Sequence, residues 1–258
     1  GFPPRHPVHL PNVIDEPSTF DYGPQHQSTC GFTFNEKRGA SHSKPAVFGP
    51  DWWGRDVLMT GYSRGKIWRT KLVKTASGYV AQTQLIAGLN MLPADNCVSP
   101  LGDLVIAVHS GQPDWGSGPK GKGKLYKVSY TDKNIPQPVQ VWPASSTETR
   151  IEFDRSLTAE ELKDLSKRLT ITEGRYVSAG DQFEYWRPGY QVVQDQMFEP
   201  RYQLKVLSAA MDADGRTLII RTAPRNRAVN YAISLRGNRE LPTPEGTLPQ
   251  HNTIELAH

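Results

Sequence analysis

Two histidines stand where an imidazole can act on a bound ligand. His109 follows the apolar run 104–108, so a strand that ends there presents the ring at the end of a sheet. His26 lies in the loop formed by residues 23–27. Because the pKa of imidazole lies near neutrality, either residue can serve as a general base. The alternative for each is a structural histidine that is hydrogen-bonded to the backbone.

An acidic cluster near the N-terminus offers oxygen ligands. Asp15, Glu16 and Asp21 lie close together in sequence, with Asn12 beside them. Calcium is bound by carboxylate and amide oxygens of this kind, so these carboxylates are candidate Ca²⁺ ligands. Their spacing is not that of an EF-hand, and a solvated turn is the alternative.

Aromatic and polar side chains in loops form a candidate ligand surface. Trp52, Trp53 and Trp115 lie outside the clean apolar strands, and an exposed indole can stack on the C–H face of a sugar ring. Asp114 precedes Trp115 in a long glycine-rich loop, and Arg64 lies in a short turn before a strand. We expect these five residues to contact a carbohydrate. Structural packing is the alternative for each tryptophan.

Cys30 and Cys97 are the only cysteines. Far apart in sequence, they are consistent with one disulfide in an oxidising compartment or with two buried free thiols. The chain has no CxxCH motif, so it does not bind haem covalently.

Composition narrows the class of protein. In a chain of 258 residues, 37% hydrophobic and 22% charged residues are typical of a soluble globular protein rather than a disordered one. The 22 glycines and 21 prolines favour turns and short strands over long helices. The net charge of +4 is spread along the chain without a nucleic-acid-binding motif, so we expect no nucleic-acid partner. No apolar run approaches the roughly 20 residues of a membrane span.

The fold predicted from these patterns is all-β. Residues 54–69 and 102–127 share one pattern: glycine, aspartate, an apolar strand, a turn, then Gly-Lys followed by an aliphatic, an aromatic and a basic residue. The two copies lie about 50 residues apart, the size of a propeller blade. We therefore expect residues 1–147 to form about three blades of a β-propeller. Closure needs about four or more, so another polypeptide is expected to complete the ring.

The second half has a different composition. The proline-containing stretch 136–148 predicts a linker, and residues 148–236 hold short strands at the spacing of a small immunoglobulin-like β-sandwich. Thr158 and Glu161 form a capping box that opens one short helix. Residues 237–258 form a polar tail, in which 254–256 are expected to make a last strand that rejoins another part of the fold.

Three segments carry a resemblance to a known family: HLPNVIDEPSTFDYGPQHQSTCGF (9–32), SRGKIWRTKLVKT (63–75) and HSGQPDWGSGPKGKGKLYKV (109–128). They resemble large secreted proteins of planctomycete- and verrucomicrobia-type bacteria. Those proteins combine a propeller similar to soluble quinoprotein sugar dehydrogenases with c-type haem modules. Residues 150–235 resemble the immunoglobulin-like module found there.

The resemblance implies part of a periplasmic or secreted carbohydrate oxidoreductase. PQQ and Ca²⁺ would be its cofactors, and electrons would pass to c-type haem on a partner module or chain. His26 or His109 would take the proton of a sugar hydroxyl, and Asp15, Asp21 or Asp114 would be cofactor or Ca²⁺ ligands. Two departures are the missing haem motif and the small number of blades.

Two other functions fit the same residues. One is a non-catalytic glycan-binding or scaffold propeller within a larger extracytoplasmic complex. The other is a polysaccharide hydrolase or lyase, which requires a close pair of carboxylates. The chain opens without the basic and apolar regions of a signal peptide, so we expect a portion of a longer protein.

Overall fold

Strands dominate the structure, a computed structural model. Within the described residues the chain forms seventeen strands and three short helices, so the predicted all-β class is confirmed. In the same part of the chain, no helix is long and apolar enough to cross a membrane. The structure describes residues 29–37, 46–62, 65–76, 78–89, 91–110, 121–131, 133–174, 177–180, 200–227, 229–237, 240–243, 246–249 and 253–257.

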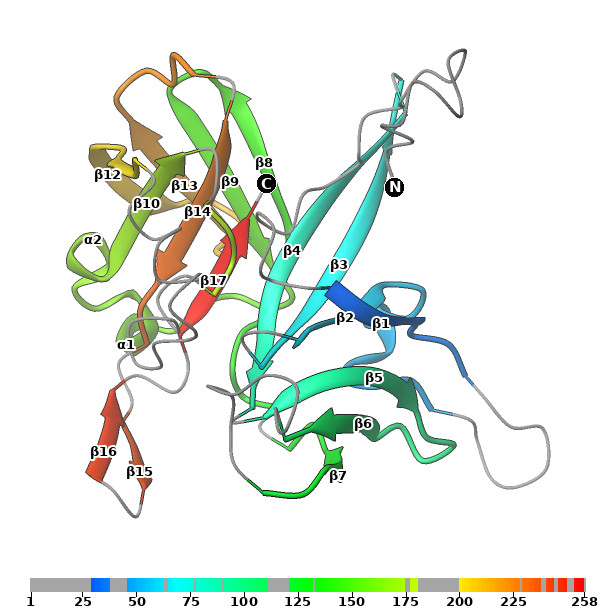
Figure 1. The fold of residues 1–258 in the computed structure, drawn as a ribbon. Coiled ribbons are helices and arrows are strands. Elements are labelled where there is room, and N and C mark those ends of the chain that lie inside the picture. Colours follow the sequence, from blue (N-terminus) through cyan, green and yellow to red (C-terminus); the bar gives the residue numbers. More distant parts are fainter. Residues whose placement is uncertain are drawn as a thin grey trace, which may run out of the picture.

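The largest sheet has eight antiparallel strands in the order β1-β2-β3-β4-β17-β14-β10-β11 (Figure 1). Its first four strands are consecutive in the chain. The strand expected near the C-terminus is confirmed as β17, which lies between β4 and β14 and so joins the two halves into one sheet. The strands are β1 (Thr29–Phe34), β2 (Val57–Gly61), β3 (Lys66–Thr75), β4 (Gly78–Gly88), β17 (Ile254–Ala257), β14 (Asn230–Leu235), β10 (Leu169–Gly174) and β11 (Tyr202–Gln203).

Three smaller antiparallel sheets complete the described fold, with the orders β5-β6-β7, β12-β13-β9-β8 and β15-β16. Within the described residues none of the sheets closes into a barrel. The strands are β5 (Leu92–Val98), β6 (Leu104–His109), β7 (Lys124–Val128), β8 (Pro138–Ser145), β9 (Glu148–Phe153), β12 (Val206–Met211), β13 (Thr217–Thr222), β15 (Glu240–Thr243) and β16 (Gly246–Pro249).

The β1–β4 meander packs face to face on the β5–β7 meander. Successive side chains of a strand point to opposite faces, so alternate apolar residues collect on one side. Leu58 and Ile67 from the first sheet meet Leu104 and Ile106 from the second, and all four are fully buried. The alternation of side chains along these strands therefore builds the core between the two meanders.

A second core lies between the β8–β9–β13–β12 sheet and the β17–β14–β10–β11 part of the large sheet. Phe153 and Ile220 of the first sheet pack there with Ile171 and Ile233 of the second, so the two sheets form a sandwich. Two one-turn helices, α1 (Ala159–Leu162) and α2 (Leu165–Arg168), lead into β10.

The predicted capping box is confirmed at the start of α1. The Thr158 hydroxyl accepts a hydrogen bond from the Glu161 backbone N–H at 3.3 Å, and the Glu161 carboxylate accepts one from the Thr158 N–H at 2.8 Å. Both donors belong to the first turn, where no carbonyl is available to them within the helix.

The predicted linker at 136–148 is wrong over most of its length, because β8 occupies residues 138–145. Proline lacks the N–H that a central strand donates, but an edge strand tolerates it. β8 is the edge strand of its sheet; Pro138 begins it, and Pro143 borders a shift in the register with β9. Proline content alone therefore misidentified an edge strand as a linker.

Polar side chains of β3 and β4 connect the two cores. The Lys71 ammonium donates to the Val139 carbonyl at 3.0 Å. The Gln82 amide donates to the Val141 carbonyl and accepts from the Val141 N–H, so one side chain pairs with the edge of β8 as a neighbouring strand would. Gln84 donates to the Gln137 side chain at 3.1 Å.

Candidate functional site

The predicted site residues divide into two groups. Seven lie outside the described residues: His26, Asp15, Glu16, Asp21, Arg64, Asp114 and Trp115. The described ones are His109, Trp52, Trp53, Cys30 and Cys97.

His109 lies beside Tyr62 at one end of the β1–β4 and β5–β7 meanders. Their ring centroids are 6.2 Å apart with an angle of 36° between the planes, and both side chains are half-buried. Tyr62 follows β2, as His109 ends β6. The two residues stand six positions after Asp56 and Asp103, so they occupy equivalent places in the internal repeat. Aligning the two copies residue by residue is the sequence signal that identifies Tyr62.

Tight turns hold this end of the sheets in place. Gly65 has φ of +68°, in the left-handed region that favours glycine, and its carbonyl accepts the Leu89 N–H at 2.7 Å. A Cβ on Gly65 would lie 1.9 Å from the Leu89 carbonyl oxygen. Leu92 pairs directly with His109. The β2–β3 and β4–β5 connections are therefore packed against each other beside the Tyr62–His109 pair.

The repeat also carries an ion pair in each copy. In the first, Arg69 Nε lies 3.5 Å from Asp56 Oδ2, and both side chains are buried. In the second, Lys127 Nζ lies 3.9 Å from Asp103 Oδ2, and the lysine is exposed. One aspartate before an apolar strand thus meets the basic residue of the following strand in both hairpins.

Arg69 packs against both of the described indoles that were predicted to stack on a sugar. Its guanidinium carbon is 4.8 Å from the centre of the Trp52 ring and 4.6 Å from that of Trp53. Both residues belong to the short 3-10 helix η1 (Asp51–Trp53). Trp53 is only 2% exposed and also packs against Tyr130, whereas Trp52 is half-buried. Trp52 and Trp53 therefore contact a guanidinium of the chain itself, and Trp53 is almost completely buried.

Burial shifts the pKa values of both Asp56 and Arg69. It raises the pKa of Asp56 to about 6, although the positive charges of Arg69 and Lys71 oppose the rise. Burial likewise lowers the pKa of Arg69 to about 10, against the opposing effects of Asp56, Asp154 and Tyr130. Arg69 also donates to the Pro138 carbonyl at 2.7 Å, at the start of β8. Both shifts disfavour the charged forms, so desolvation outweighs the attraction between the two groups.

Cys30 and Cys97 are not joined by a disulfide in the structure, and both are exposed rather than buried. Cys97 alternates along β5 with Asn96 and Val98, which are buried, so its side chain points to the outer face of the sheet. Partial burial and then the negative charge of Asp95 raise the pKa of the Cys30 thiol, which favours its protonated form.

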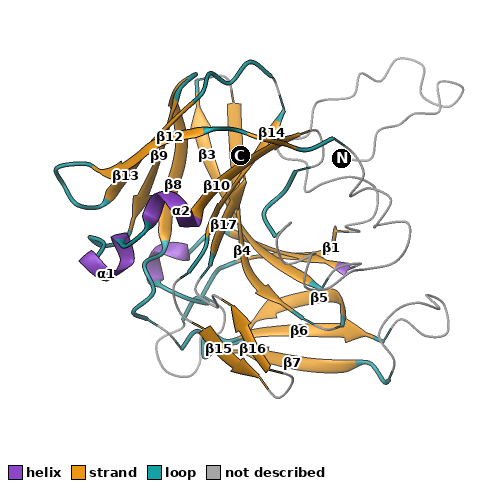
Figure 2. Ribbon diagram, turned by 90° about the vertical axis from the view of Figure 1, so that its left-hand side faces the viewer, coloured by secondary structure: helices purple, strands orange, loops and turns teal. Residues whose placement is uncertain are grey.

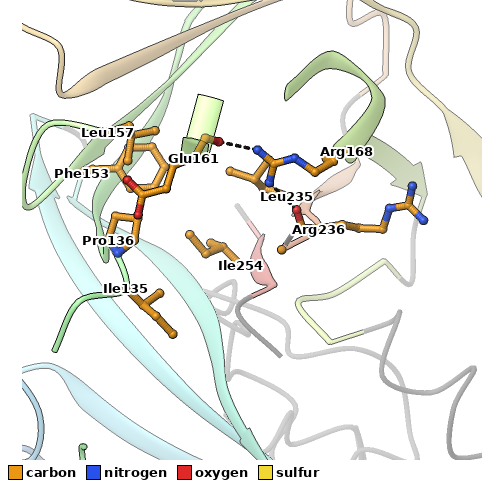
Figure 3. Close-up of a pocket in the computed structure, with 10 residues that line it drawn as sticks. Ile135, Pro136, Phe153, Leu157, Glu161, Arg168, Leu235, Arg236 and Ile254 are labelled. Atoms are coloured by element: carbon orange, nitrogen blue, oxygen red, sulfur yellow. Dashed lines mark hydrogen bonds between the residues drawn. The ribbon is translucent and has the colours of Figure 1, made fainter. Parts of the chain in front are cut away.

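A small pocket lies where α1, α2 and the chain entering β8 meet (Figure 3). Its volume of about 30 Å³ suits water rather than a sugar. The Arg168 guanidinium lines it but donates to the backbone carbonyls of Glu161 and Arg236. This arginine therefore has a structural role in joining α1 and α2 to the segment after β14.

The described residues contain no group of three or more histidine, cysteine or acidic side chains that could hold a metal ion. The carboxylates predicted as Ca²⁺ ligands lie outside the described residues. No model of a known protein family, no curated protein and no solved structure matches the chain. What the chain binds is therefore inferred from its own residues.

Proposed function

We propose that the chain is a carbohydrate-binding scaffold within a larger extracytoplasmic complex. It would consist of part of a β-propeller joined to an immunoglobulin-like sandwich. The observation that carries the binding function is the Tyr62–His109 pair: two half-buried rings at equivalent positions of an internal repeat, at one end of two stacked meanders. The extracytoplasmic location rests on the family resemblance of the sequence.

The stacking of the two meanders supports the propeller assignment. Blades of a propeller are antiparallel meanders of about four strands that pack face to face around an axis. The β1–β4 sheet has four strands and packs on β5–β7 through Leu58, Ile67, Leu104 and Ile106. Equivalent ion pairs in the β2–β3 and β6–β7 hairpins support their origin as copies of one unit.

Strand order supports the immunoglobulin-like assignment. If β8 to β14 are taken in sequence as A, B, C, C′, D, E and F, and β17 as G, the two sheets read A-B-E-D and C′-C-F-G. This order agrees with the sheet composition of the immunoglobulin fold. The Tyr231 hydroxyl at the start of β14 donates to the Arg227 carbonyl at 2.8 Å, as in the tyrosine corner of strand F in such domains.

Carbohydrate binding can be tested by isothermal titration with soluble polysaccharides such as xylan and alginate. The variants Tyr62→Ala and His109→Ala should each weaken binding about tenfold, because each removes one ring surface from the ligand. Tyr79→Ala is the matched control, since Tyr79 is an exposed aromatic residue on β4. Unchanged affinity in both test variants would place the site elsewhere, and Trp115→Ala would then be examined.

A quinoprotein-like carbohydrate oxidoreductase is the second candidate. The observation that favours it is the position of His109, a half-buried imidazole at a strand end beside the Tyr62 ring, where it can accept a proton from a sugar hydroxyl. PQQ with Ca²⁺ would supply the oxidant. The test is sugar-dependent reduction of a redox dye after both are added; no reduction with any sugar would reject this candidate.

A further inference from the structure

β7 is the counterpart of β3 in the internal repeat. Both strands follow a glycine and begin with lysine: Lys66-Ile67-Trp68-Arg69 in β3 corresponds to Lys124-Leu125-Tyr126-Lys127 in β7. The Arg69–Asp56 and Lys127–Asp103 ion pairs fix this register in space. The environments of the two strands can therefore be compared residue by residue.

The counterparts differ sharply in exposure. Ile67 is fully buried, whereas Leu125 is 75% exposed. Arg69 is 4% exposed and Lys127 is 69% exposed at the side chain. A leucine left this exposed in the middle of a strand loses most of the free energy that its burial would provide. These side chains of β7 are therefore exposed to solvent, whereas their counterparts on β3 are buried.

The two strands also differ in their neighbours. β3 pairs with β2 on one edge and with β4 on the other, but among the described strands β7 pairs with β6 alone. Figure 2 shows β7 at the border of its three-stranded sheet. In the part of the chain that the structure describes, this edge of β7 is unpaired, and it presents backbone N–H and C=O groups that a further strand can bind.

The pairing of β3 with β4 defines what such a strand needs. Trp68 pairs with Leu85 and Arg69 with Gln84, so a strand in the same place would set an apolar residue opposite Tyr126 and a polar one opposite Lys127. Tyr126 and Val128 already pack against the core between the meanders, so an apolar residue beside them would extend that core. Lys122, Lys124 and Lys127 are exposed, which favours an acidic residue at the polar position.

We propose that the unpaired edge of β7 is a docking site for an extended strand of another polypeptide, which pairs with β7 as β4 pairs with β3. The docked strand alternates apolar residues with polar ones, including an acidic side chain opposite Lys127. This proposal rests on the proposed function, in which a partner chain contributes to the propeller. It identifies the edge at which that partner joins.

The probe is a labelled peptide that copies residues 80–88, together with the same peptide carrying Gln84→Glu. Fluorescence anisotropy with the full chain should show saturable binding of both peptides, and the acidic version should bind about threefold to tenfold more tightly at low salt. Lys127→Glu should reverse that preference. Lys74→Glu is the matched control because Lys74 is an exposed lysine of β3, and it should change neither affinity.

N-methylation of the peptide distinguishes binding through backbone hydrogen bonds from binding through charge attraction alone. Methyl groups on alternate amides along the pairing edge of the peptide should abolish binding, while methyl groups along its other edge should leave it intact. Binding of neither peptide would overturn the proposal. So would slow hydrogen exchange of the outward β7 amides in the chain alone, because the edge would then already be filled. Neither result alters the polysaccharide titration, which tests the proposed function separately.

Discussion

Replacing Asp56 by asparagine is expected to stabilise the protein at pH 8, although the change removes one partner of an ion pair. Asp56 and Arg69 lie 3.5 Å apart and are both buried, so each charge has lost most of its hydration. The pKa shifts show which effect is larger, because burial raises the pKa of Asp56 and lowers that of Arg69 despite their attraction. Asparagine keeps the shape of the side chain without its charge.

The size of the expected change in unfolding free energy follows from the pKa of Asp56. This pKa is about 6 in the folded protein, compared with 3.8 for an ordinary aspartate. The Asp56 carboxyl group therefore holds its proton more tightly in the folded state than in the unfolded state. The contribution of Asp56 to stability is therefore fully present below pH 3.8 and is lost as the pH rises to about 6. The difference of about two pH units corresponds to about 3 kcal/mol of unfolding free energy. Arg69, with a pKa of about 10, stays charged throughout this window.

The assay is urea unfolding, followed by tryptophan fluorescence, at several pH values from 4 to 8. Wild type and Asp56→Asn should have similar unfolding free energies at pH 4. They should diverge as the pH rises, until the variant is more stable by up to about 3 kcal/mol at pH 8. The repeat provides a matched control in Asp103→Asn, whose partner Lys127 is exposed and whose effect should be about 1 kcal/mol or less at every pH.

One result would refute the reasoning: a variant that is less stable than wild type at pH 8, with the gap closing towards pH 4. The attraction between Asp56 and Arg69 would then outweigh the cost of burying them. Glu161 does not interfere with the comparison. Although burial opposes the shift, hydrogen bonds from Arg155 and Thr158 lower the pKa of Glu161 to about 2, so its contribution to stability begins to fall only below its ordinary value of 4.5. Any effect at pH 4 is the same in wild type and Asp56→Asn, and it cancels in their difference.

Three further substitutions test the scaffold. Gly65→Ala should lower the unfolding free energy by at least about 2 kcal/mol, since it strains a left-handed residue and brings a Cβ against the Leu89 carbonyl; circular dichroism during thermal unfolding measures this. Tyr231→Phe should cost about 1 kcal/mol in urea unfolding by removing the hydrogen bond to Arg227, and no change would mean that this bond is not formed in solution. Phe153→Ala should cost about 3–5 kcal/mol in the same assay, because Phe153 is fully buried between the two sheets of the sandwich.

Local patterns predicted much of the fold. The repeated pattern of an apolar run, a turn and a second strand identified β2, β3, β6 and β7, because each part of that pattern is formed by residues close together in the chain. The capping box at Thr158 identified the start of α1 for a similarly local reason, since its hydrogen bonds join residues three positions apart.

The errors and omissions came from longer-range effects. Proline content suggested a linker where β8 forms, because whether a strand is central or at an edge depends on distant residues. Trp53, one of the tryptophans predicted to stack on a sugar, is buried, because Arg69 and Tyr130 from distant parts of the chain pack against it. Tyr62 and Asp56 were not among the predicted site residues, although an alignment of the two copies of the repeat points to both, because their contacts with His109 and Arg69 form only in the fold.

The sequence by itself determined the all-β class, the positions of most strands, the capping box and the repeat, because each depends on residues close together in the chain. Only the tertiary structure decided that β17 joins the two halves, that His109 lies beside Tyr62, and that β7 has an edge with which no other described strand pairs. A period-2 pattern states which face of a strand is apolar. It does not state which other strand covers that face, since this is set by the packing of all the sheets together.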